Sequence, residues 1–337
     1  MLTVAQALAN TRSNTLRRWH SGPDTGTRGT DPADASNRIF DGYADIRPTY
    51  DGPRFAAATP VFAMGSCFAR EIEHALSARG GNVISIDDRI ERPEFEDAGG
   101  KVRTTFFHRY TPTAMAQEFR WPFGRQDGWS EDALIFAAAA GNDVDLNYAA
   151  VAADNTPEAV ALRRGVAGAL VRKLVDARII IVTLGLTEGW VHLPTGLAVN
   201  AMSPRMLKAR PEEFALSQID YPTVIASLQG ILDLIEAEHA DGDFQLFVTV
   251  SPVPFQSTFS REDIVEANLT SKSTLRAAAV AFVREHERVH YFPSYELVTY
   301  TSPDLAWRPD RVHVNPGMVK HIMNRFIDTV YEPAAFG

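Results

Sequence analysis

The sequence predicts an α/β protein with a mostly parallel β-sheet that is covered by helices on both faces. Short apolar runs alternate along the chain with segments whose apolar residues recur every three or four positions, which is helical spacing. Strands that alternate with helices join in parallel through crossover connections. The clearest run, Ile179 to Leu184, is rich in β-branched residues and is typical of a strand buried on both faces.

The first half of the chain indicates a strand and a helix most directly. Val61 to Met64 is an apolar run that ends at Gly65, so we expect a buried strand there. Apolar residues then recur at helical spacing from Phe68 to Leu76, and the pattern stops before a pair of glycines. The other elements expected in this half are a strand at 83–86, a polar loop at 87–104, a helix at 112–120 and an irregular stretch at 121–157.

The second half shows the alternation of strands and helices more clearly. Leucine and valine residues four apart mark a helix over 162–174, just before the buried strand at 179–184. The remaining elements expected there are helices at 224–235, 270–287 and 319–327 and strands at 244–250 and 289–292.

The N-terminal 40 residues are expected to form a partly irregular arm outside the main domain. Residues 21–36 are rich in Gly, Pro, Ser, Thr and Asp and offer almost nothing to bury. Residues 41–337 are then one domain with an insert at about 87–157, because 337 residues of which 45% are hydrophobic can form a full core.

Composition excludes several classes of function. The 33 basic and 42 acidic residues give a net charge of −9, the wrong sign for a general nucleic-acid binder. The single cysteine, Cys67, allows no internal disulfide and no CxxC metal motif. The histidines form no HxxxH or HExxH pattern, and nucleotide-binding glycine motifs are absent, so we expect no metal and no cofactor.

The chain is expected to stay in the cytoplasm. Met1 to His20 lacks the basic and apolar regions of a secretory signal. No run approaches the 18 or more apolar residues that a membrane span needs. The oligomeric state is left open.

Ser66 is the first candidate for chemistry because it follows a predicted strand and a glycine and opens a predicted helix. Ligands of parallel sheets gather at the carboxyl ends of the strands. A helix start also presents free N–H groups and the positive end of the helix dipole, which suit an oxyanion. Serine is equally common as a helix N-cap, so both interpretations stand. Cys67 is a conceivable nucleophile, although a cysteine at this position more often packs inward.

Asp310 and His313 supply what a serine nucleophile needs. A serine hydroxyl is a poor nucleophile until a base takes its proton, and the base needs a group that fixes its tautomer. Asp-x-x-His in one loop can provide both groups. The alternative is a surface loop whose aspartate caps the last helix.

Residues beyond the strand at 179–184 and near residue 108 are candidates for substrate or oxyanion contacts. Thr187, Glu188 and Trp190 could line a pocket, or they could form a turn in which Trp190 covers the core. Glu188 accepts hydrogen bonds only, so it could hold a sugar hydroxyl but not an oxyanion. His108 and Arg109 form either a pair beside the substrate or an exposed polar cluster.

These segments resemble a known family. Gly65-Ser66-Cys67-Phe68-Ala69 spells the motif that names the GSCFA family, whose members resemble SGNH/GDSL hydrolases. The segments that are also similar to this family are 183–190, 249–254, 267–276 and 291–296.

The resemblance implies a flavodoxin-like three-layer α/β/α sandwich of the SGNH hydrolase type, with Ser66 as the nucleophile. It places the Asp-x-x-His block on Asp310 and His313, with His321 as the fallback base. SGNH enzymes usually draw oxyanion donors from a glycine and an asparagine, and that asparagine is absent here. The oxyanion hole is therefore expected to use the Ser66 or Cys67 amide together with Gly185 and Thr187.

The leading hypothesis is a serine-dependent acyl or acetyl esterase that uses Ser66, His313 and Asp310. The resemblance and aromatic residues such as Trp190 suggest a small-molecule or glycan ester as substrate. An O-acyltransferase would use the same site with a sugar hydroxyl in place of water. A non-catalytic binding protein that retains the fold is the third hypothesis, because fold does not fix function.

Overall fold

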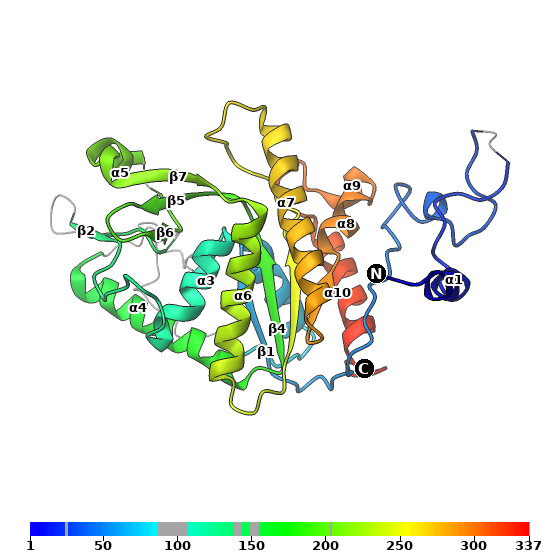
Figure 1. The fold of residues 1–337 in the computed structure, drawn as a ribbon, viewed down its shortest axis with the longest axis horizontal. Coiled ribbons are helices and arrows are strands. Elements are labelled where there is room, and N and C mark those ends of the chain that lie inside the picture. Colours follow the sequence, from blue (N-terminus) through cyan, green and yellow to red (C-terminus); the bar gives the residue numbers. More distant parts are fainter. Residues whose placement is uncertain (24–25, 87–106, 138–142, 149–154, 203, 337) are drawn as a thin grey trace.

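The computed structural model describes residues 1–23, 26–86, 107–137, 143–148, 155–202 and 204–336. Its centre is a four-stranded parallel sheet in the order β1-β4-β8-β9 (Figure 1). The four strands are β1 (Val61–Gly65), β4 (Ile179–Leu184), β8 (Gln245–Val250) and β9 (Val289–Phe292). The prediction of a mostly parallel sheet is confirmed, and each of the four strands lies at or within one residue of its predicted range.

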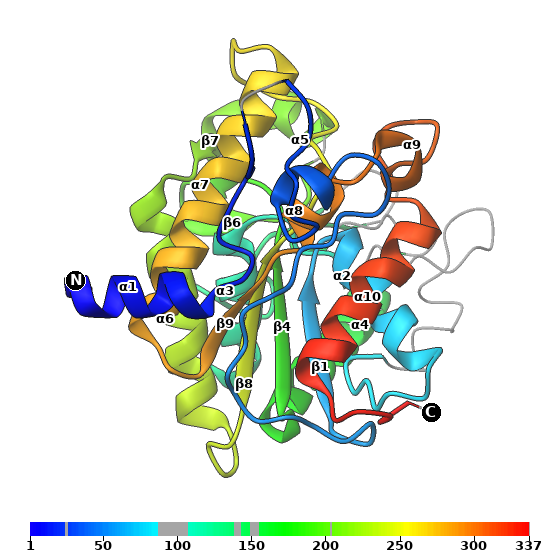
Figure 2. The same ribbon diagram turned by 90° about the vertical axis from the view of Figure 1, so that its right-hand side faces the viewer.

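Helices cover both faces of this sheet (Figures 1 and 2). The helices α3 (Pro112–Arg120), α6 (Tyr221–Glu238) and α7 (Ile264–Glu285) pack on one face, and α2 (Cys67–Ser77) and α10 (Pro316–Val330) pack on the other. Successive strand residues point to opposite faces. Ile180 and Val182 therefore join one core and Ile179 and Ile181 the other. This explains why the strands read as apolar runs without polar alternation.

The helices begin where the sequence supplies caps. Asp220 accepts a hydrogen bond from the Thr223 amide at the start of α6, and Asn315 accepts one from the Gly317 amide at the start of α10. Helix α4 (Pro157–Arg172) begins behind Thr156 in the same way. Every helix predicted from periodicity is present, with bounds that differ by a few residues at either end.

A second, antiparallel sheet was not predicted. It consists of β6 (Leu197–Val199), β5 (Glu188–His192) and β7 (Phe214–Gln218), in that order. Helix α5 (Pro204–Ala209) connects β6 to β7, and a hairpin of β2 (Ile135–Ala137) and β3 (Asp143–Asp145) lies in the stretch expected to be irregular. Leu197, Val199 and Phe214 share a small core with Phe136 and Leu146, so these strands bury one face together.

The strand expected at 83–86 is only an isolated parallel bridge between Val83 and Val61. Beyond it the Ala63 amide donates to the Ser85 hydroxyl at 3.0 Å, so a side chain takes the place of a backbone partner. The polar loop expected at 87–104 lies outside the described residues.

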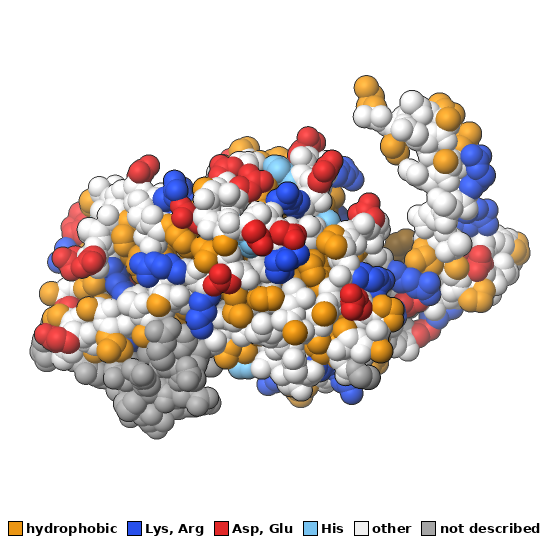
Figure 3. Space-filling view, turned by 90° about the horizontal axis from the view of Figure 1, so that it is seen from below, with side chains coloured by type: hydrophobic (Ala, Val, Ile, Leu, Met, Phe, Trp, Pro, Cys, Tyr) orange, Lys and Arg blue, Asp and Glu red, His pale blue; other side chains and the backbone are white. Residues whose placement is uncertain are grey.

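The N-terminal arm contains a helix that the sequence did not indicate. Helix α1 (Val4–Ser13) starts with a capping box between Thr3 and Gln6 and buries none of its side chains. The arm projects from the body (Figures 1 and 3). It joins the body through hydrogen bonds from the Phe40 amide to the Tyr300 carbonyl and from the Ala44 amide to the Thr301 hydroxyl.

Two short helices follow the last strand, α8 (Ser294–Thr299) and α9 (Pro303–Ala306). They lead to the loop before α10, at the edge of the sheet where the parallel strands end. Among the helices of the described residues, none has the length and apolar character needed to cross a membrane.

Candidate active site

Ser66 lies directly after β1, at the N-cap position of α2. Its side chain does not cap the helix, although serine commonly does so. The residue is 4% exposed, and its Oγ is buried with no hydrogen-bond partner among the described residues. A buried hydroxyl without a partner costs about 1–3 kcal/mol, so such groups are uncommon in folded proteins. The hydroxyl is therefore free for a reaction.

Gly65 fixes the turn that presents Ser66. A Cβ on Gly65 would lie 2.5 Å from the Thr183 carbonyl oxygen, which is closer than real side chains approach. On its other side, Gly65 pairs with His108, and its carbonyl accepts the Arg109 amide at 2.8 Å. Only glycine fits between these two chain segments.

Cys67 is partly buried at the first position of α2. Burial raises the pKa of its thiol, and the Glu71 carboxylate raises it further, while Lys272 acts in the opposite direction. A raised pKa keeps the sulfur as a thiol at neutral pH, and the thiolate is the nucleophilic form. Ser66 is therefore the better candidate for the nucleophile.

His108 and Arg109 are not the exposed cluster that one interpretation expected. His108 is 5% exposed and Arg109 is 1% exposed. Burial, together with the charges of Arg70 and Arg109, lowers the pKa of His108 to about 3, so its imidazole is neutral at physiological pH. Its Nδ1 lies 3.3 Å from the Tyr110 hydroxyl. The backbone of His108 pairs with that of Gly65, so His108 lies close to Ser66.

Two buried ion pairs lie beneath this segment. Arg109 pairs with Glu118 of α3 at 2.8 Å, with both side chains almost fully buried. Arg70 pairs with Glu73 on α2 at 2.6 Å, and burial raises the pKa of Glu73 to about 7. Because removal of one member of a buried pair strands the other charge, these pairs fix the segment firmly.

The turn after β4 brings Gly185 and Thr187 to the same edge of the sheet. A Cβ on Gly185 would lie 2.5 Å from the Tyr110 carbonyl oxygen, so the two segments touch at backbone distance. The Thr187 amide donates to Ser271 Oγ at 3.0 Å. Thr187 was expected to contribute to the oxyanion hole, and its amide is already occupied by this bond. The Gly185 carbonyl accepts a hydrogen bond from Lys272 Nζ at 2.7 Å.

Glu188 and Trp190 hold a neighbouring loop. The Glu188 carboxylate accepts hydrogen bonds from the Thr258 hydroxyl at 2.5 Å and from the Phe259 amide at 2.9 Å. The ring of Trp190 stands edge-on to that of Phe259, with centroids 5.2 Å apart. These contacts join the loop after β8 to the second sheet. Glu188 therefore helps to hold that loop in place.

Asp310 and His313 form the pair that the sequence predicted. The Asp310 carboxylate lies 2.8 Å from His313 Nδ1, and its other oxygen accepts the Val312 and His313 amides at 2.9 and 3.0 Å. The hydrogen bond with His313 is the largest cause that holds the pKa of Asp310 below its usual range. An aspartate on Nδ1 leaves Nε2 free to accept a proton. Both side chains are exposed, 48% for Asp310 and 58% for His313.

The loop that carries His313 is closed by backbone contacts. Trp307 and Val314 form an antiparallel bridge, and the Arg308 amide donates to the His313 carbonyl at 2.8 Å. Val314 belongs to the same core as Phe68 of α2, and α2 packs on α10. The loop and Ser66 therefore lie at the same edge of the sheet, but no hydrogen bond joins Ser66 to His313.

His321 was the fallback base. It is instead engaged: its Nε2 lies 2.9 Å from the Ala44 carbonyl oxygen, and its ring stacks on Tyr43 with centroids 4.9 Å apart. A ring nitrogen bonded to a carbonyl must carry its proton. His321 Nε2 therefore cannot accept the proton of Ser66.

Sequence reasoning assigned no role to Lys272, which is fully buried on α7. A signal was present, because Lys272 falls in a row with buried Leu275 and Ala279 at helical spacing. A lysine on the apolar face of a helix is unusual.

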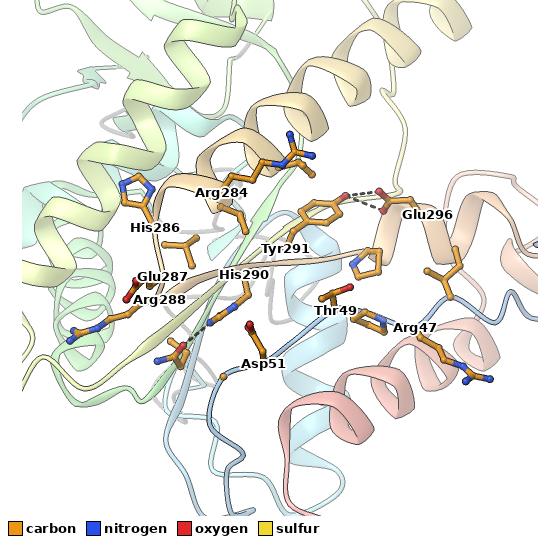
Figure 4. Close-up of a pocket in the computed structure, with 18 of the residues that line it drawn as sticks. Arg47, Thr49, Asp51, Arg284, His286, Glu287, Arg288, His290, Tyr291 and Glu296 are labelled. Carbon is orange, nitrogen blue, oxygen red and sulfur yellow. Dashed lines mark hydrogen bonds between the residues drawn. The ribbon is translucent and has the colours of Figure 1, made fainter. Parts of the chain in front are cut away.

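A wide hollow of about 1070 Å³ lies elsewhere, along the outer edge of β9 (Figure 4). Its walls are α7 and residues 46–53, and none of the predicted site residues lines it. Two pairs of its polar groups are bonded to each other: the Tyr291 hydroxyl donates to Glu296, and His290 Nε2 lies 2.6 Å from Gln245 Oε1. Among the described residues no group of three or more potential metal ligands comes together.

The fold and the site together define an α/β protein with a serine at the carboxyl edge of a parallel sheet. The GSCFA family model matches residues 60–326, and the chain belongs to the GSCFA family. No curated protein matches the chain. Among solved structures, the chain is similar to a carbohydrate esterase family 3 protein from Talaromyces cellulolyticus. That match has 13% identity and a TM-score of 0.32 and covers 80% of this chain and 94% of the other, so it adds nothing on activity.

Proposed function

We propose that the protein is a serine esterase that hydrolyses acyl esters, with Ser66 as the nucleophile, His313 as the base and Asp310 as the group that orients the base. The observation that carries this proposal is the Ser66 hydroxyl, which is buried, unpartnered among the described residues and placed at a helix start. The Asp310–His313 pair on the same edge of the sheet supports it.

The reaction follows from these groups. Ser66 Oγ attacks the ester carbonyl carbon while its proton passes to His313 Nε2, and the carbonyl electron pair becomes the oxyanion. When the intermediate collapses, the bond to the alcohol oxygen breaks and the alcohol leaves with the proton from His313. Water then attacks the acyl-enzyme in the same way, which releases the acid and restores Ser66.

Closure of the triad needs one adjustment, because Ser66 and His313 are not hydrogen-bonded without substrate. Hydrogen bonds between catalytic groups are often long in free enzymes and tighten when substrate binds. The His313 side chain is 58% exposed, so a movement of that side chain costs little packing.

The oxyanion would be stabilised at the start of α2. The first amides of a helix have no partners within it, and the helix dipole favours negative charge there. The Cys67 amide is the donor nearest to Ser66 along the chain. Because the Thr187 amide already donates to Ser271, the turn after β4 must contribute through Gly185 or through the shape that it imposes.

The finer form of the fold belongs to the same proposal. Strand order β1-β4-β8-β9, with the Val83 bridge outside β1, would correspond to the flavodoxin-like order of a three-layer SGNH hydrolase. For the substrate, we propose an acylated carbohydrate or a similar small ester. The Trp190–Phe259 pair near the turn after β4 offers an aromatic surface, and Phe259 is 58% exposed.

The test is hydrolysis of p-nitrophenyl esters of two to eight carbons by the wild type and by Ser66→Ala. The expected result is a loss of kcat/KM by at least about 10³-fold in Ser66→Ala. Its thermal midpoint should stay equal or rise, because an unpartnered buried hydroxyl is removed. Ser77→Ala, an exposed serine at the end of the same helix, is the matched control and should keep full activity.

Two outcomes would redirect the proposal. Hydrolysis that survives Ser66→Ala would rule out Ser66 as the nucleophile. A well-folded wild type that hydrolyses none of the esters would favour a binding protein with this fold. Addition of a sugar acceptor separates hydrolysis from O-acyl transfer, because a transferase would make acylated sugar at the expense of free acid.

A further inference from the structure

Lys272 has no role in the reaction proposed above. It lies in the first half of α7 and is fully buried. Its Nζ donates two hydrogen bonds of 2.7 Å, one to the carbonyl of Gly185 and one to that of Val253. These carbonyls belong to the turns that follow β4 and β8, two strands that pair side by side.

The neighbouring residue reinforces the same contact. Ser271 is also fully buried, and its Oγ accepts the Thr187 amide at 3.0 Å. Together, Ser271 and Lys272 hold the turn after β4 at both ends, and Lys272 also reaches the turn after β8. Helix α7 therefore fixes the turns after β4 and β8, at the same edge of the sheet as Ser66.

The charge of Lys272 is not balanced by a carboxylate. Among the described residues, no aspartate or glutamate forms an ion pair with it, and the one titratable group that acts on its charge is Cys67. Burial of a cation without a counter-ion is costly. An ammonium has three N–H donors, and the two carbonyls engage two of them.

The position of Cys67 shows where this charge is felt. Lys272 and the Cys67 thiol act on each other electrostatically, and Cys67 is the residue after Ser66. Burial lowers the pKa of Lys272 to about 7, so the ammonium form dominates below pH 7 and is lost as the pH rises above that value. The other titratable groups that act on Cys67 are Glu71 of the same helix and Tyr110 before α3.

We propose that Lys272 is a positioning residue of the Ser66 site, which clamps the Gly185 and Val253 turns and places an uncompensated positive charge behind Ser66 and Cys67. This proposal rests on the proposed function. Since no carboxylate of the described residues pairs with this charge, it favours the state in which an oxyanion forms on the substrate.

The first test does not depend on ester hydrolysis. Cys67 is the only cysteine, so the pH dependence of its alkylation by iodoacetamide reports the charge beside Ser66. In Lys272→Met, we expect alkylation below pH 7 to be about three- to tenfold slower than in the wild type. The difference should shrink above pH 8, where Lys272 is neutral in the wild type. Lys320→Met, which removes an exposed lysine on α10, should alkylate like the wild type.

The second test separates charge from support of the fold. Lys272→Met should lower kcat on acyl esters by about 10- to 100-fold and leave KM within about threefold, because the charge acts mainly on the transition state. Ser271→Ala loses the adjacent support but keeps the charge, and it should lose less. Lys272→Gln keeps a donor for one carbonyl and serves if Lys272→Met does not fold.

Three results would overturn the proposal: unchanged alkylation in both Lys272 variants, unchanged kcat, or a loss in kcat no larger than that of Ser271→Ala. A wild type without esterase activity would refute the proposed function instead, and alkylation would still decide whether Lys272 places a charge at this corner.

Discussion

The two halves of the proposed triad are built in opposite ways. Ser66 is 4% exposed and is surrounded by segments from distant parts of the chain, including His108, Gly185 and Lys272. His313 has a side chain that is 58% exposed, and its orientation comes from Asp310 three residues away. The nucleophile depends on long-range packing, whereas the base depends on local hydrogen bonds within one loop.

Because of this difference, substitutions in the two halves should affect activity and stability to different extents. Changes in the loop of His313 should remove activity and leave the fold intact, because the loop buries little. Changes around Ser66 should affect both, because the same buried groups support the sheet edge and shape the site. The predictions below test that division, from the largest expected effect to the smallest.

The loop half should respond in activity alone. We expect His313→Ala to lower kcat/KM by about 10³-fold or more, and Asp310→Asn by about 10²- to 10⁴-fold, because the imidazole loses its fixed tautomer. Thermal midpoints should remain close to that of the wild type, since both side chains are exposed. Steady-state kinetics and calorimetry check both statements. Full activity in His313→Ala would mean that another group is the base.

The buried half should respond in stability. Arg109→Met leaves Glu118 buried without its partner, so we expect a loss of about 3–5 kcal/mol in the free energy of unfolding. Arg311→Met removes a pair with Asp304 whose side chains are 55% and 85% exposed, and it should change stability by less than about 1 kcal/mol. Urea unfolding compares the two variants. Equal losses would contradict the contrast between buried and exposed pairs.

Two glycines give a sharper version of the same contrast. Gly65→Ala places a Cβ 2.5 Å from the Thr183 carbonyl, so we expect a loss of about 1–3 kcal/mol together with reduced activity. Gly165 of α4 faces open space, and Gly165→Ala should stabilise the protein by about 0.5–1 kcal/mol. A Gly65→Ala variant as active and stable as the wild type would show that the turn tolerates a side chain.

The dependence of stability on pH should reveal the lowered pKa of Lys272. Its pKa is lowered to about 7 in the folded protein and returns to about 10.4 in the unfolded chain. Between these values the unfolded chain binds more protons, so the free energy of unfolding rises with pH. From pH 7 to pH 9 we expect the wild type to gain about 2 kcal/mol relative to Lys272→Met. A constant difference across this range would mean that the pKa of Lys272 is the same in the folded protein and in the unfolded chain.

Much of the fold could be predicted from local patterns. The four central strands are apolar on both faces, so each reads as a continuous run, and the amphipathic helices reveal their buried stripe. The second sheet was missed because its strands are short and partly exposed, as the mixed burial of β5 shows. The segment expected to be a strand at 83–86 forms only an isolated bridge, because the Ala63 amide donates to the Ser85 side chain and not to a backbone carbonyl.

The site could be predicted where its parts are local in sequence. Asp310 and His313 lie in one turn, so the Asp-x-x-His spacing together with the family resemblance indicated the pair. The burial of His108, the use of the Thr187 amide by Ser271 and the position of Lys272 all depend on contacts between segments 80 or more residues apart. No local pattern specifies such contacts.

The most direct test of the account is labelling of the wild type with a fluorophosphonate, followed by peptide mapping of the adduct by mass spectrometry. The account predicts one adduct on Ser66, absent in Ser66→Ala, much slower in His313→Ala and unchanged in Ser77→Ala. A folded protein that forms no adduct, or forms it at a residue other than Ser66, would contradict the assignment of this buried hydroxyl as the nucleophile.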